Sequence, residues 1–412
     1  MPKSPTLASR KSARGLLLLG PAFVAAIAYV DPGNVAANLT GGARYGYMLV
    51  WVLVAANIMA ALVQYQSAKL GIVTGETLPG LLGRRLGTTS RRAFWVQAEL
   101  IAVATDLAEV IGGAIALHLL FGLPLPFGGL IVGVVSMLLL ATQDRFGQRP
   151  FESVIIALLV IVAIGFLAGL AVNPPDPGEI VGGLVPRFEG TDSVLLAASM
   201  LGATVMPHAI YVHSALARDR HGHVTSAPAR LSLLRATRWD VGLALGIAGI
   251  VNLGMLLLAA VNLQGERGTD SIEGAHAAIE VALGPVIALI FAIGLLASGL
   301  ASTSVGSYAG ATIMEGLLRK RIPLLVRRVV TLIPALGLLA IGADPTTALV
   351  LSQVVLSFGI PFALIPLLRL TNDRALMQEQ ANGRAMRVAL SIIVALVVGL
   401  NLTLIVLTVT GI

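Results

Sequence analysis

The sequence predicts an all-α integral membrane protein with eleven transmembrane helices, of which the first and the sixth are discontinuous. Hydrophobic residues make up 56% of the 412 residues and charged residues only 12%, which is too little charge for a soluble domain of this size. The sequence also contains eleven apolar stretches of about 20 residues, each long enough to cross a hydrocarbon core roughly 30 Å thick. Proline with polar neighbours interrupts the first and the sixth of these stretches. These observations predict a helical membrane domain with irregular backbone inside two of its spans.

The apolar stretches follow one another with short loops, so we expect a single membrane transport domain over residues 1–412. In chain order, the predicted spans are 15–40, 46–70, 93–120, 123–142, 151–172, 193–217, 240–263, 282–306, 323–342, 346–370 and 387–411. If spans one to five form a unit, their odd number means that spans six to ten must repeat the unit with the opposite orientation in the membrane. Paired discontinuous helices in inverted repeats indicate the substrate site of a secondary transporter. We therefore predict a 5+5 inverted repeat over about 15–172 and 193–370, with 387–411 as an extra helix.

Basic residues are distributed very unevenly between the two sides of the predicted membrane domain. With the N-terminus in the cytoplasm, the segments on that side hold 25 of the 28 Lys and Arg residues, and the external loops hold 3. The positive-inside rule therefore predicts a multi-pass protein of the cell membrane with a cytoplasmic N-terminus and an extracellular C-terminus. The net charge of +7 is explained by this topology, so no nucleic-acid partner is predicted.

The two prolines inside the broken spans each free one backbone carbonyl. Proline lacks the amide hydrogen that would bond to the carbonyl four residues earlier, so Pro32 frees the carbonyl of Ala28 and Pro207 frees that of Ala203. In a bilayer such carbonyls must find another partner or line a hydrated cavity. Both lie at the C-terminal end of a half-helix, where the helix dipole is negative. We therefore expect both carbonyls to favour a cation.

The side chains beside these prolines are a carboxylate from Asp31, an amide from Asn34 and a thioether from Met206. Cysteine is absent, which excludes iron–sulfur clusters and thiolate sites and leaves oxygen, imidazole and methionine sulfur as ligands. Magnesium and calcium prefer oxygen ligands, whereas a thioether binds softer first-row transition metals. The pattern therefore predicts a site for a divalent transition metal. The alternatives are that Met206 only fills a gap in the core and that Asp31 only makes a structural hydrogen bond across the break.

Four stretches of the sequence together are typical of one transporter family. They are Asp-Pro-Gly-Asn at 31–34, Ala-Thr-Asp-Leu-Ala-Glu at 104–109, Gly-Ala-Thr-Val-Met-Pro-His at 202–208 and Tyr-Val-His-Ser-Ala-Leu at 211–216. In these stretches the chain resembles the Nramp family of proton-coupled divalent metal transporters, of the bacterial manganese/iron type, and the resemblance covers essentially the whole chain. It implies a LeuT-like fold and proton-coupled uptake of Mn²⁺ or Fe²⁺.

By motif match, the resemblance also implies which residues bind the metal. The implied ligands are Asp31, Asn34, Met206 and the carbonyls of Ala28 and Ala203. In span ten, Gln353 matches a family glutamine that approaches the metal in some states. Spacing alone would not separate Gln353 from Ser352 or Ser357.

Acidic residues form a stripe along span three. Glu99, Asp106 and Glu109 are separated by seven and three residues, so they lie on one face of a helix. A polar stripe inside a membrane is costly unless it borders water or exchanges protons. No Lys or Arg is expected mid-span to neutralise it, and the nearest candidates are Arg327 and Arg328 at the cytoplasmic end of span nine.

Two histidines follow the second break, His208 directly after the proline and His213 five residues later. Histidine titrates near physiological pH, so histidines and acids together suit a proton relay. The alternative is a neutral histidine bonded to a backbone carbonyl. Asp31 is expected to serve both metal and proton, because a nearby dipositive ion favours its ionised form. The predicted proton pathway comprises Asp31, Glu109, Asp106, His208, His213 and Arg328.

The sequence therefore predicts a symporter that carries protons and divalent transition metals, Mn²⁺ or Fe²⁺, into the cytoplasm by alternating access. The alternatives are a broader divalent carrier that includes Mg²⁺, a sodium-coupled carrier on the same fold, and a metal ion channel. A membrane metalloenzyme is set aside because the sequence has no His-Glu-x-x-His pattern. We expect no cofactor, and as partners only the transported ions and the lipid bilayer, with a monomer as a plausible unit.

Overall fold

The computed structural model describes residues 20–410 except 147, 223, 225, 266, 267, 270 and 321–323. Over these residues the chain forms helices and no strand, which confirms the predicted all-α class. In order, the helices are α2 (Pro21–Ile27), η1 (Ala28–Val30), α3 (Pro32–Tyr45), α4 (Val50–Thr74), α5 (Leu78–Arg85), α6 (Thr88–Phe121), α7 (Leu125–Phe146), α8 (Gln148–Val172), α9 (Pro177–Gly182), α10 (Gly190–Thr204), α11 (Pro207–His221), α12 (Ala227–Asn262), α13 (Ile272–Leu283), α14 (Pro285–Leu318), α15 (Leu324–Ala340), α16 (Pro345–Asn372), α17 (Arg374–Met377), η2 (Gln378–Gln380) and α18 (Arg384–Thr410).

Each predicted span coincides with a helix or with a helix pair separated by a break. In the described part of the chain, eight helical segments are long and apolar enough to cross a membrane, and two shorter apolar ones are Pro21–Val30 and Leu125–Leu139. The number of eleven crossings therefore stays a prediction, as do the repeat boundaries. Parts of the predicted ranges, residues 15–19, 323 and 411, lie outside the described residues.

Two helices extend well beyond their predicted ranges. Helix α12 begins at Ala227, whereas the predicted span began at 240, and α14 continues to Leu318, whereas the predicted span ended at 306. The turns of α12 that precede the predicted span carry Arg230, Arg235 and Arg238. A search for apolar stretches therefore leaves them out, although the helix continues through them. Apolar length marks the membrane-embedded part of a helix and not its ends.

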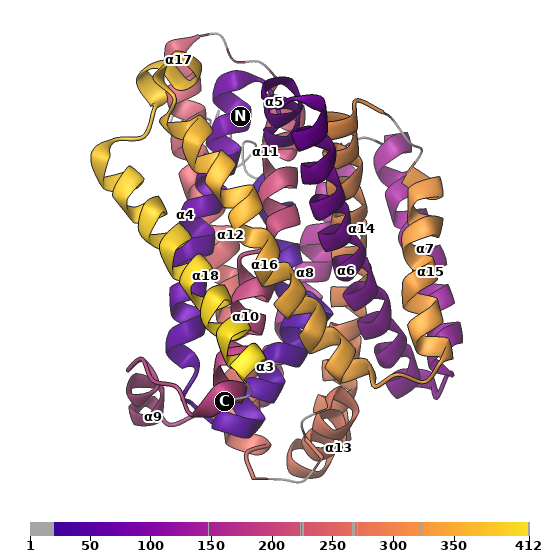
Figure 1. Cartoon of the computed structure of the whole chain (residues 1–412). Coiled ribbons are helices and arrows are strands. Elements are labelled where there is room, and N and C mark those ends of the chain that lie inside the picture. Colours follow the sequence, from indigo (N-terminus) through magenta and orange to yellow (C-terminus); the bar gives the residue numbers. More distant parts are fainter. Residues whose placement is uncertain are drawn as a thin grey trace, which may run out of the picture.

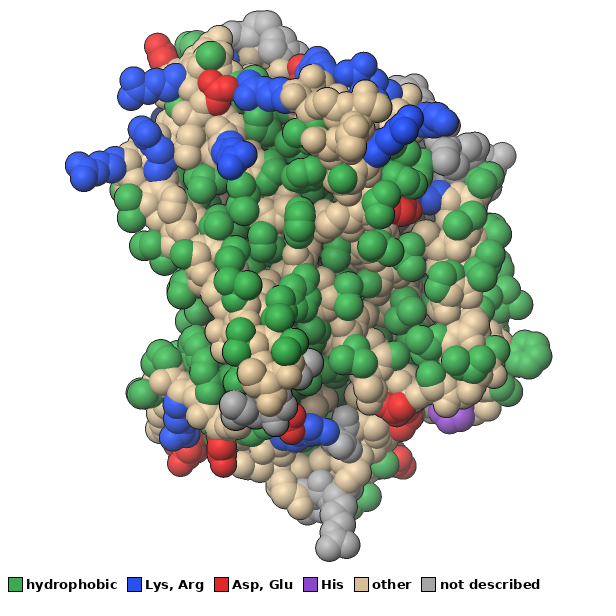
Figure 2. Space-filling model, in the orientation of Figure 1, with side chains coloured by type: hydrophobic (Ala, Val, Ile, Leu, Met, Phe, Trp, Pro, Cys, Tyr) green, Lys and Arg blue, Asp and Glu red, His purple; other side chains and the backbone are tan. Residues whose placement is uncertain are grey.

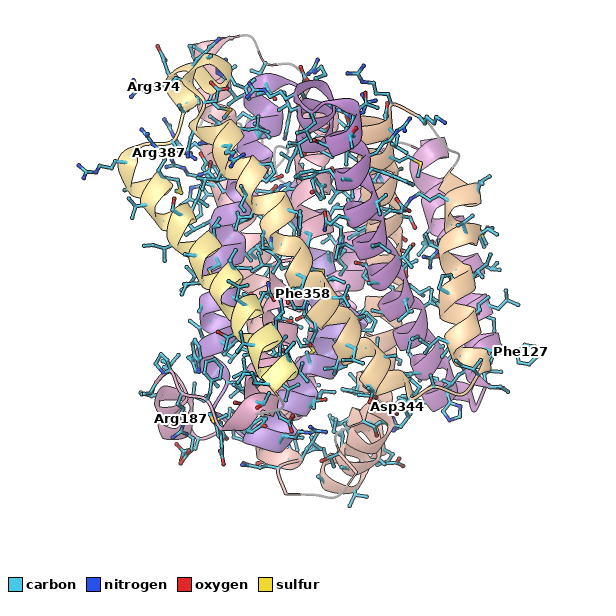
Figure 3. All side chains as sticks on the ribbon, viewed as in Figure 1. Phe127, Arg187, Asp344, Phe358, Arg374 and Arg387 are labelled. Carbon is cyan, nitrogen blue, oxygen red and sulfur yellow. The ribbon has the colours of Figure 1, made fainter. Side chains whose placement is uncertain are left out.

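The long helices run side by side between two polar ends (Figure 1). Helices α5 and α17 lie at one end, and α9 and α13 lie at the opposite end, where α18 also finishes. Figure 2 shows hydrophobic side chains around the waist and Lys and Arg side chains gathered at the end that holds α17. Figure 3 labels Arg374 and Arg387 at this basic end, and Arg187, Asp344 and Phe127 at the other. This charge distribution agrees with the orientation predicted from the loops.

The two broken helices lie inside the bundle. Helix α3 packs against α10, α12 and α16, and α11 packs against α4, α14 and α16. Every residue of α10 from Leu196 to Thr204 is buried, as is every residue of α11 from Pro207 to Ala217. Because both breaks are enclosed by other helices, their irregular backbone is shielded from lipid.

Candidate metal centre

The first break separates α2 and η1 from α3. After the 3₁₀ turn, Asp31 adopts an extended conformation with φ −71° and ψ 166°, and α3 starts at Pro32. Proline suits the first position of a helix, because its missing amide hydrogen would have no intrahelical partner there. The Asp31 carboxylate caps α3 by accepting a hydrogen bond of 2.8 Å from the Asn34 backbone amide. Asp31 and Asn34 are both fully buried, so the break places a carboxylate and an amide in the interior.

The second break, between α10 and α11, likewise has an extended residue followed by a proline that starts a helix. Helix α10 ends at Thr204, Met206 is extended with φ −67° and ψ 123°, and Pro207 starts α11. Met206 is fully buried, and its sulfur is therefore held in the interior beside the break.

Hydrogen bonds join the two breaks. The Asn34 side-chain amide donates to the carbonyl of Ala203 at 2.8 Å and to the carbonyl of Tyr29 at 2.7 Å. The carbonyl that Pro207 was predicted to free thus obtains a new partner from the first break. Asp31, Asn34 and Ala203 are therefore neighbours in space, although Asn34 and Ala203 are 169 residues apart along the chain.

Helix α16 brings Gln353 to the same place. The Gln353 side-chain nitrogen lies 3.5 Å from the second oxygen of Asp31. Close approach of α16 depends on Gly202, because a Cβ at that position would lie 2.0 Å from the Gln353 carbonyl oxygen. The structure thus places Gln353 against Asp31, whereas Ser352 and Ser357 donate their hydroxyls to backbone carbonyls of their own helix.

Two buried amide oxygens at this junction have no hydrogen-bond partner among the described residues, namely Asn34 Oδ1 and Gln353 Oε1. Leaving a buried oxygen without a hydrogen-bond partner costs about 1–3 kcal/mol. Each of these oxygens is therefore expected to accept a hydrogen bond from water or to bind an ion. Together with Asp31 and Met206, these oxygens form a set of one carboxylate, neutral oxygens and one thioether. Such a set can hold a divalent cation, yet no group of three or more His, Asp and Glu side chains in the described chain could do so.

Ala28 lies in the 3₁₀ turn of the first break and is 1% exposed. Its carbonyl was predicted as a ligand together with that of Ala203. The Ala28 amide still bonds to carbonyls of α2, so the helical pattern continues up to this residue. The role of Ala28 stays a prediction.

The acidic stripe of α6 is paired with the two arginines that the sequence offered as the nearest candidates. Arg328 is fully buried and lies 3.1 Å from Asp106, and Arg327 lies 3.0 Å from Glu99. Both arginines lie near the start of α15, and their long side chains carry the charge away from their own Cα atoms. The Arg328 Nε also donates to the Ser136 hydroxyl at 3.2 Å.

Glu109 is the one acid of the stripe without an ion pair among the described residues. It is fully buried, and neither of its carboxylate oxygens has a hydrogen-bond partner in this part of the chain. Its carboxylate faces Gly306 of α14, where a Cβ would lie 3.0 Å from both oxygens. Because Glu99 and Asp106 are paired, Glu109 is the member of the stripe best suited to gain and lose a proton.

The two histidines occupy different environments. The His208 Nδ1 lies 3.2 Å from the Thr105 hydroxyl of α6, one residue before Asp106. The His213 Nδ1 lies 2.7 Å from Gln64 Oε1 of α4, and Gln64 also donates to the Tyr29 hydroxyl. His208 therefore faces the acidic helix, whereas His213 is linked to α4 and to the turn before Asp31.

Sequence reasoning missed the polar residues that hold these groups, namely Tyr29, Gln64, Thr105 and Ser136. Gln64 offered the clearest signal, since it is a polar residue inside the apolar range 46–70. Its partners come from other helices, so its role could only be recognised once those helices were placed.

Comparisons with known proteins agree in both sequence and fold. The family model described as natural resistance-associated macrophage protein-like (Nramp) matches residues 22–407. A divalent metal cation transporter MntH of Mycobacterium tuberculosis is 63% identical over 394 residues, covering 96% of this chain and 92% of that protein. A crystal structure of the Eremococcus coleocola manganese transporter superposes with a TM-score of 0.86 at 31% identity, covering 97% of this chain and 88% of the other. MhsT, solved with L-phenylalanine, shares the fold with a TM-score of 0.60 at 13% identity over 92% of this chain and 98% of its own.

Proposed function

The chain belongs to the Nramp family, and from this premise we propose that it is a divalent metal transporter that carries Mn²⁺ or Fe²⁺ into the cytoplasm together with protons. The protein is a multi-pass membrane transporter and not an enzyme. The observation that carries the proposal is the junction of the two breaks, where a buried carboxylate lies beside the Asn34 and Gln353 side chains, whose amide oxygens have no partner among the described residues. A single carboxylate with neutral ligands suits a dication that must leave again.

We propose Asp31, Asn34, Met206, Gln353 and the carbonyl of Ala203 as the metal ligands, with the carbonyl of Ala28 as a further one. Support comes from the hydrogen bonds that place Asn34 against Ala203 and Gln353 against Asp31. The buried thioether favours a softer transition metal over magnesium. Both the MntH relatives and the E. coleocola protein carry names that agree with this class of cargo.

For the proton we propose a route along α6 that is separate from the path of the metal. Glu109 is its central carrier, because it lacks an ion pair in the described structure whereas Asp106 is paired with Arg328. His208, which contacts Thr105 beside Asp106, connects the second break to this route. His213 is a weaker candidate, since its contacts lead toward α4.

We further propose that transport proceeds by alternating access in the cell membrane, with the basic end of the bundle in the cytoplasm. Asp31, Asn34 and Met206 are all fully buried, so the site is closed to both faces in this conformation. A channel would need a continuous path at this depth, whereas an enclosed site at two broken helices suits a carrier. The uneven distribution of Lys and Arg supports the orientation, and a monomer is a sufficient unit.

The test is manganese uptake into proteoliposomes with an inside-negative potential, with internal pH recorded in the same vesicles. Saturable manganese uptake accompanied by acidification of the lumen is expected. Uptake that does not saturate would favour a channel, and uptake that requires sodium and leaves pH unchanged would favour the sodium-coupled alternative.

Replacement of Met206 by alanine is expected to weaken discrimination against magnesium. Excess magnesium should leave manganese uptake by the wild type unaffected, but should inhibit the Met206→Ala protein about ten-fold more strongly, because only the soft metal gains from sulfur. The matched control is Met200→Ala, a fully buried methionine of α10 that lies near Gly41 and six residues before Met206. Equal magnesium sensitivity in both variants would show that Met206 is a packing residue.

A further inference from the structure

Helix α14 presents two glycines to charged side chains, one to an acid of the α6 stripe and one to an arginine of α15. Gly306 and Gly310 are four residues apart, so they lie on one face of the helix. A Cβ at Gly306 would lie 3.0 Å from both carboxylate oxygens of Glu109. A Cβ at Gly310 would lie 1.8 Å from the guanidinium carbon of Arg327. The charged ends of two side chains thus rest where side chains of α14 would otherwise be.

The same face keeps the two helices close. At Gly299, two turns before Gly306, a Cβ would lie 3.2 Å from the Glu109 carbonyl oxygen and 3.1 Å from the Gly113 Cα. Small residues let membrane helices approach this closely. With the backbones so near, a side chain at position 306 would require the Glu109 carboxylate to shift by a few tenths of an ångström.

The Glu109 carboxylate is buried and meets no hydrogen-bond donor among the residues described. The charged groups close enough to act on it are Asp106, Arg328 and Asp31, none of which is on α14. At Gly306 the α14 face therefore offers Glu109 space but no counter-charge.

We propose that Gly306 is a positioning residue for proton transfer, because a side chain at this position would displace the Glu109 carboxylate from its place between α6 and α14. The absence of a side chain at Gly310 likewise leaves space for the Arg327 guanidinium, which keeps Arg327 in reach of Glu99. This inference rests on the proposed proton coupling, since it assigns a position to the proposed carrier. It adds α14 to a pathway otherwise built from α6, α11 and α15.

The test compares manganese uptake and proton flux in proteoliposomes for Gly306→Ala and for a matched control, Gly246→Ala. Gly246 lies in α12, and a Cβ there would meet no atom within 4 Å. Gly306→Ala is expected to lower proton flux about ten-fold, since small displacements of a reacting group have large rate effects. Manganese affinity should stay within about two-fold of the wild type, because Gly306 does not touch the metal site. Gly246→Ala should resemble the wild type in both.

Shortening the acid provides the rescue. Glu109→Asp removes one methylene and should restore part of the proton flux lost in Gly306→Ala, whereas Glu109→Gln, which keeps the length, should not. Thermal unfolding of the same variants reads out the steric contact if Gly306→Ala is too unstable for transport assays. The decrease in melting temperature caused by Gly306→Ala should be the same when Glu109→Gln is also present and smaller when Glu109→Asp is also present.

Each outcome decides between the inference and the function on which it rests. A wild type that takes up manganese without proton flux would overturn the proposed coupling, and the positioning role with it. A coupled wild type together with a Gly306→Ala protein of normal proton flux would overturn the positioning role alone. A melting-temperature loss that is the same with Asp, Gln and Glu at position 109 would show that Gly306 only packs against the backbone.

Discussion

Asp31→Asn is expected to abolish manganese uptake, with a loss of about 100-fold or more. Asp31 carries the only formal charge in the proposed ligand set, and two opposite unit charges about 4 Å apart attract by roughly 4 kcal/mol at a protein-like dielectric. Asparagine has the same shape, and its oxygen can still accept the 2.8 Å hydrogen bond that caps α3 at Asn34. The variant should therefore fold normally and fail only in metal binding, which titration of manganese onto the purified protein measures directly.

The control is Asp373→Asn, since Asp373 also caps a helix but lies in the linker between α16 and α17. Its carboxylate bonds to Arg85 at 2.9 Å, and this contact holds the pKa of Asp373 below its usual range. Uptake by the control should equal that of the wild type. Manganese binding by Asp31→Asn within about three-fold of the wild type would mean that Asp31 only caps α3, which is the structural alternative raised by the sequence.

The breaks could be predicted from sequence because their cause is local. Proline cannot donate a backbone hydrogen bond, and at Pro32 and Pro207 polar neighbours inside an apolar stretch marked the breaks. Proline alone would not have been enough, since Pro334, Pro361 and Pro366 lie inside the continuous helices α15 and α16. Span position could be predicted for the same reason, since apolar length reports the thickness of the membrane. The start of α12 could not, because charged turns outside the apolar core continue a helix without contributing to its hydropathy. The end of α14 could not either, because a helix can continue past the length that a membrane requires.

The contacts between helices were beyond sequence reasoning. Gln353 stands out from Ser352 and Ser357 only because its side chain reaches Asp31 and fills the space beside Gly33. Arg328 was expected at the cytoplasmic end of its span, yet its guanidinium is fully buried against Asp106. In each case the decisive quantity is the direction and reach of a side chain across an interface, and the order of residues along one helix does not contain it.

The pairing of Asp106 with Arg328 has the largest expected effect on stability. Both side chains are at most 2% exposed, so removing one partner leaves the other as an uncompensated buried charge. Breaking such a pair typically costs 3–5 kcal/mol, whereas replacing both partners is much less costly. Arg328→Met and Asp106→Asn should each lower the free energy of unfolding by about 3 kcal/mol, and the double variant should lose less than the sum of the two. The intrinsic fluorescence of the three tryptophans can follow unfolding in detergent.

Arg327→Met is the matched control for this cycle, because Arg327 neighbours Arg328 in sequence and also pairs with an acid of α6. Its partner Glu99 is 20% exposed and can turn toward water when the arginine is lost, so the expected loss is about 1 kcal/mol. Equal losses for the two arginines, or strictly additive losses in the Asp106 and Arg328 cycle, would contradict a buried ion pair. The cycle also bears on the proton route. The double variant should change proton flux less than Glu109→Gln does, because Glu109 is the proposed proton carrier.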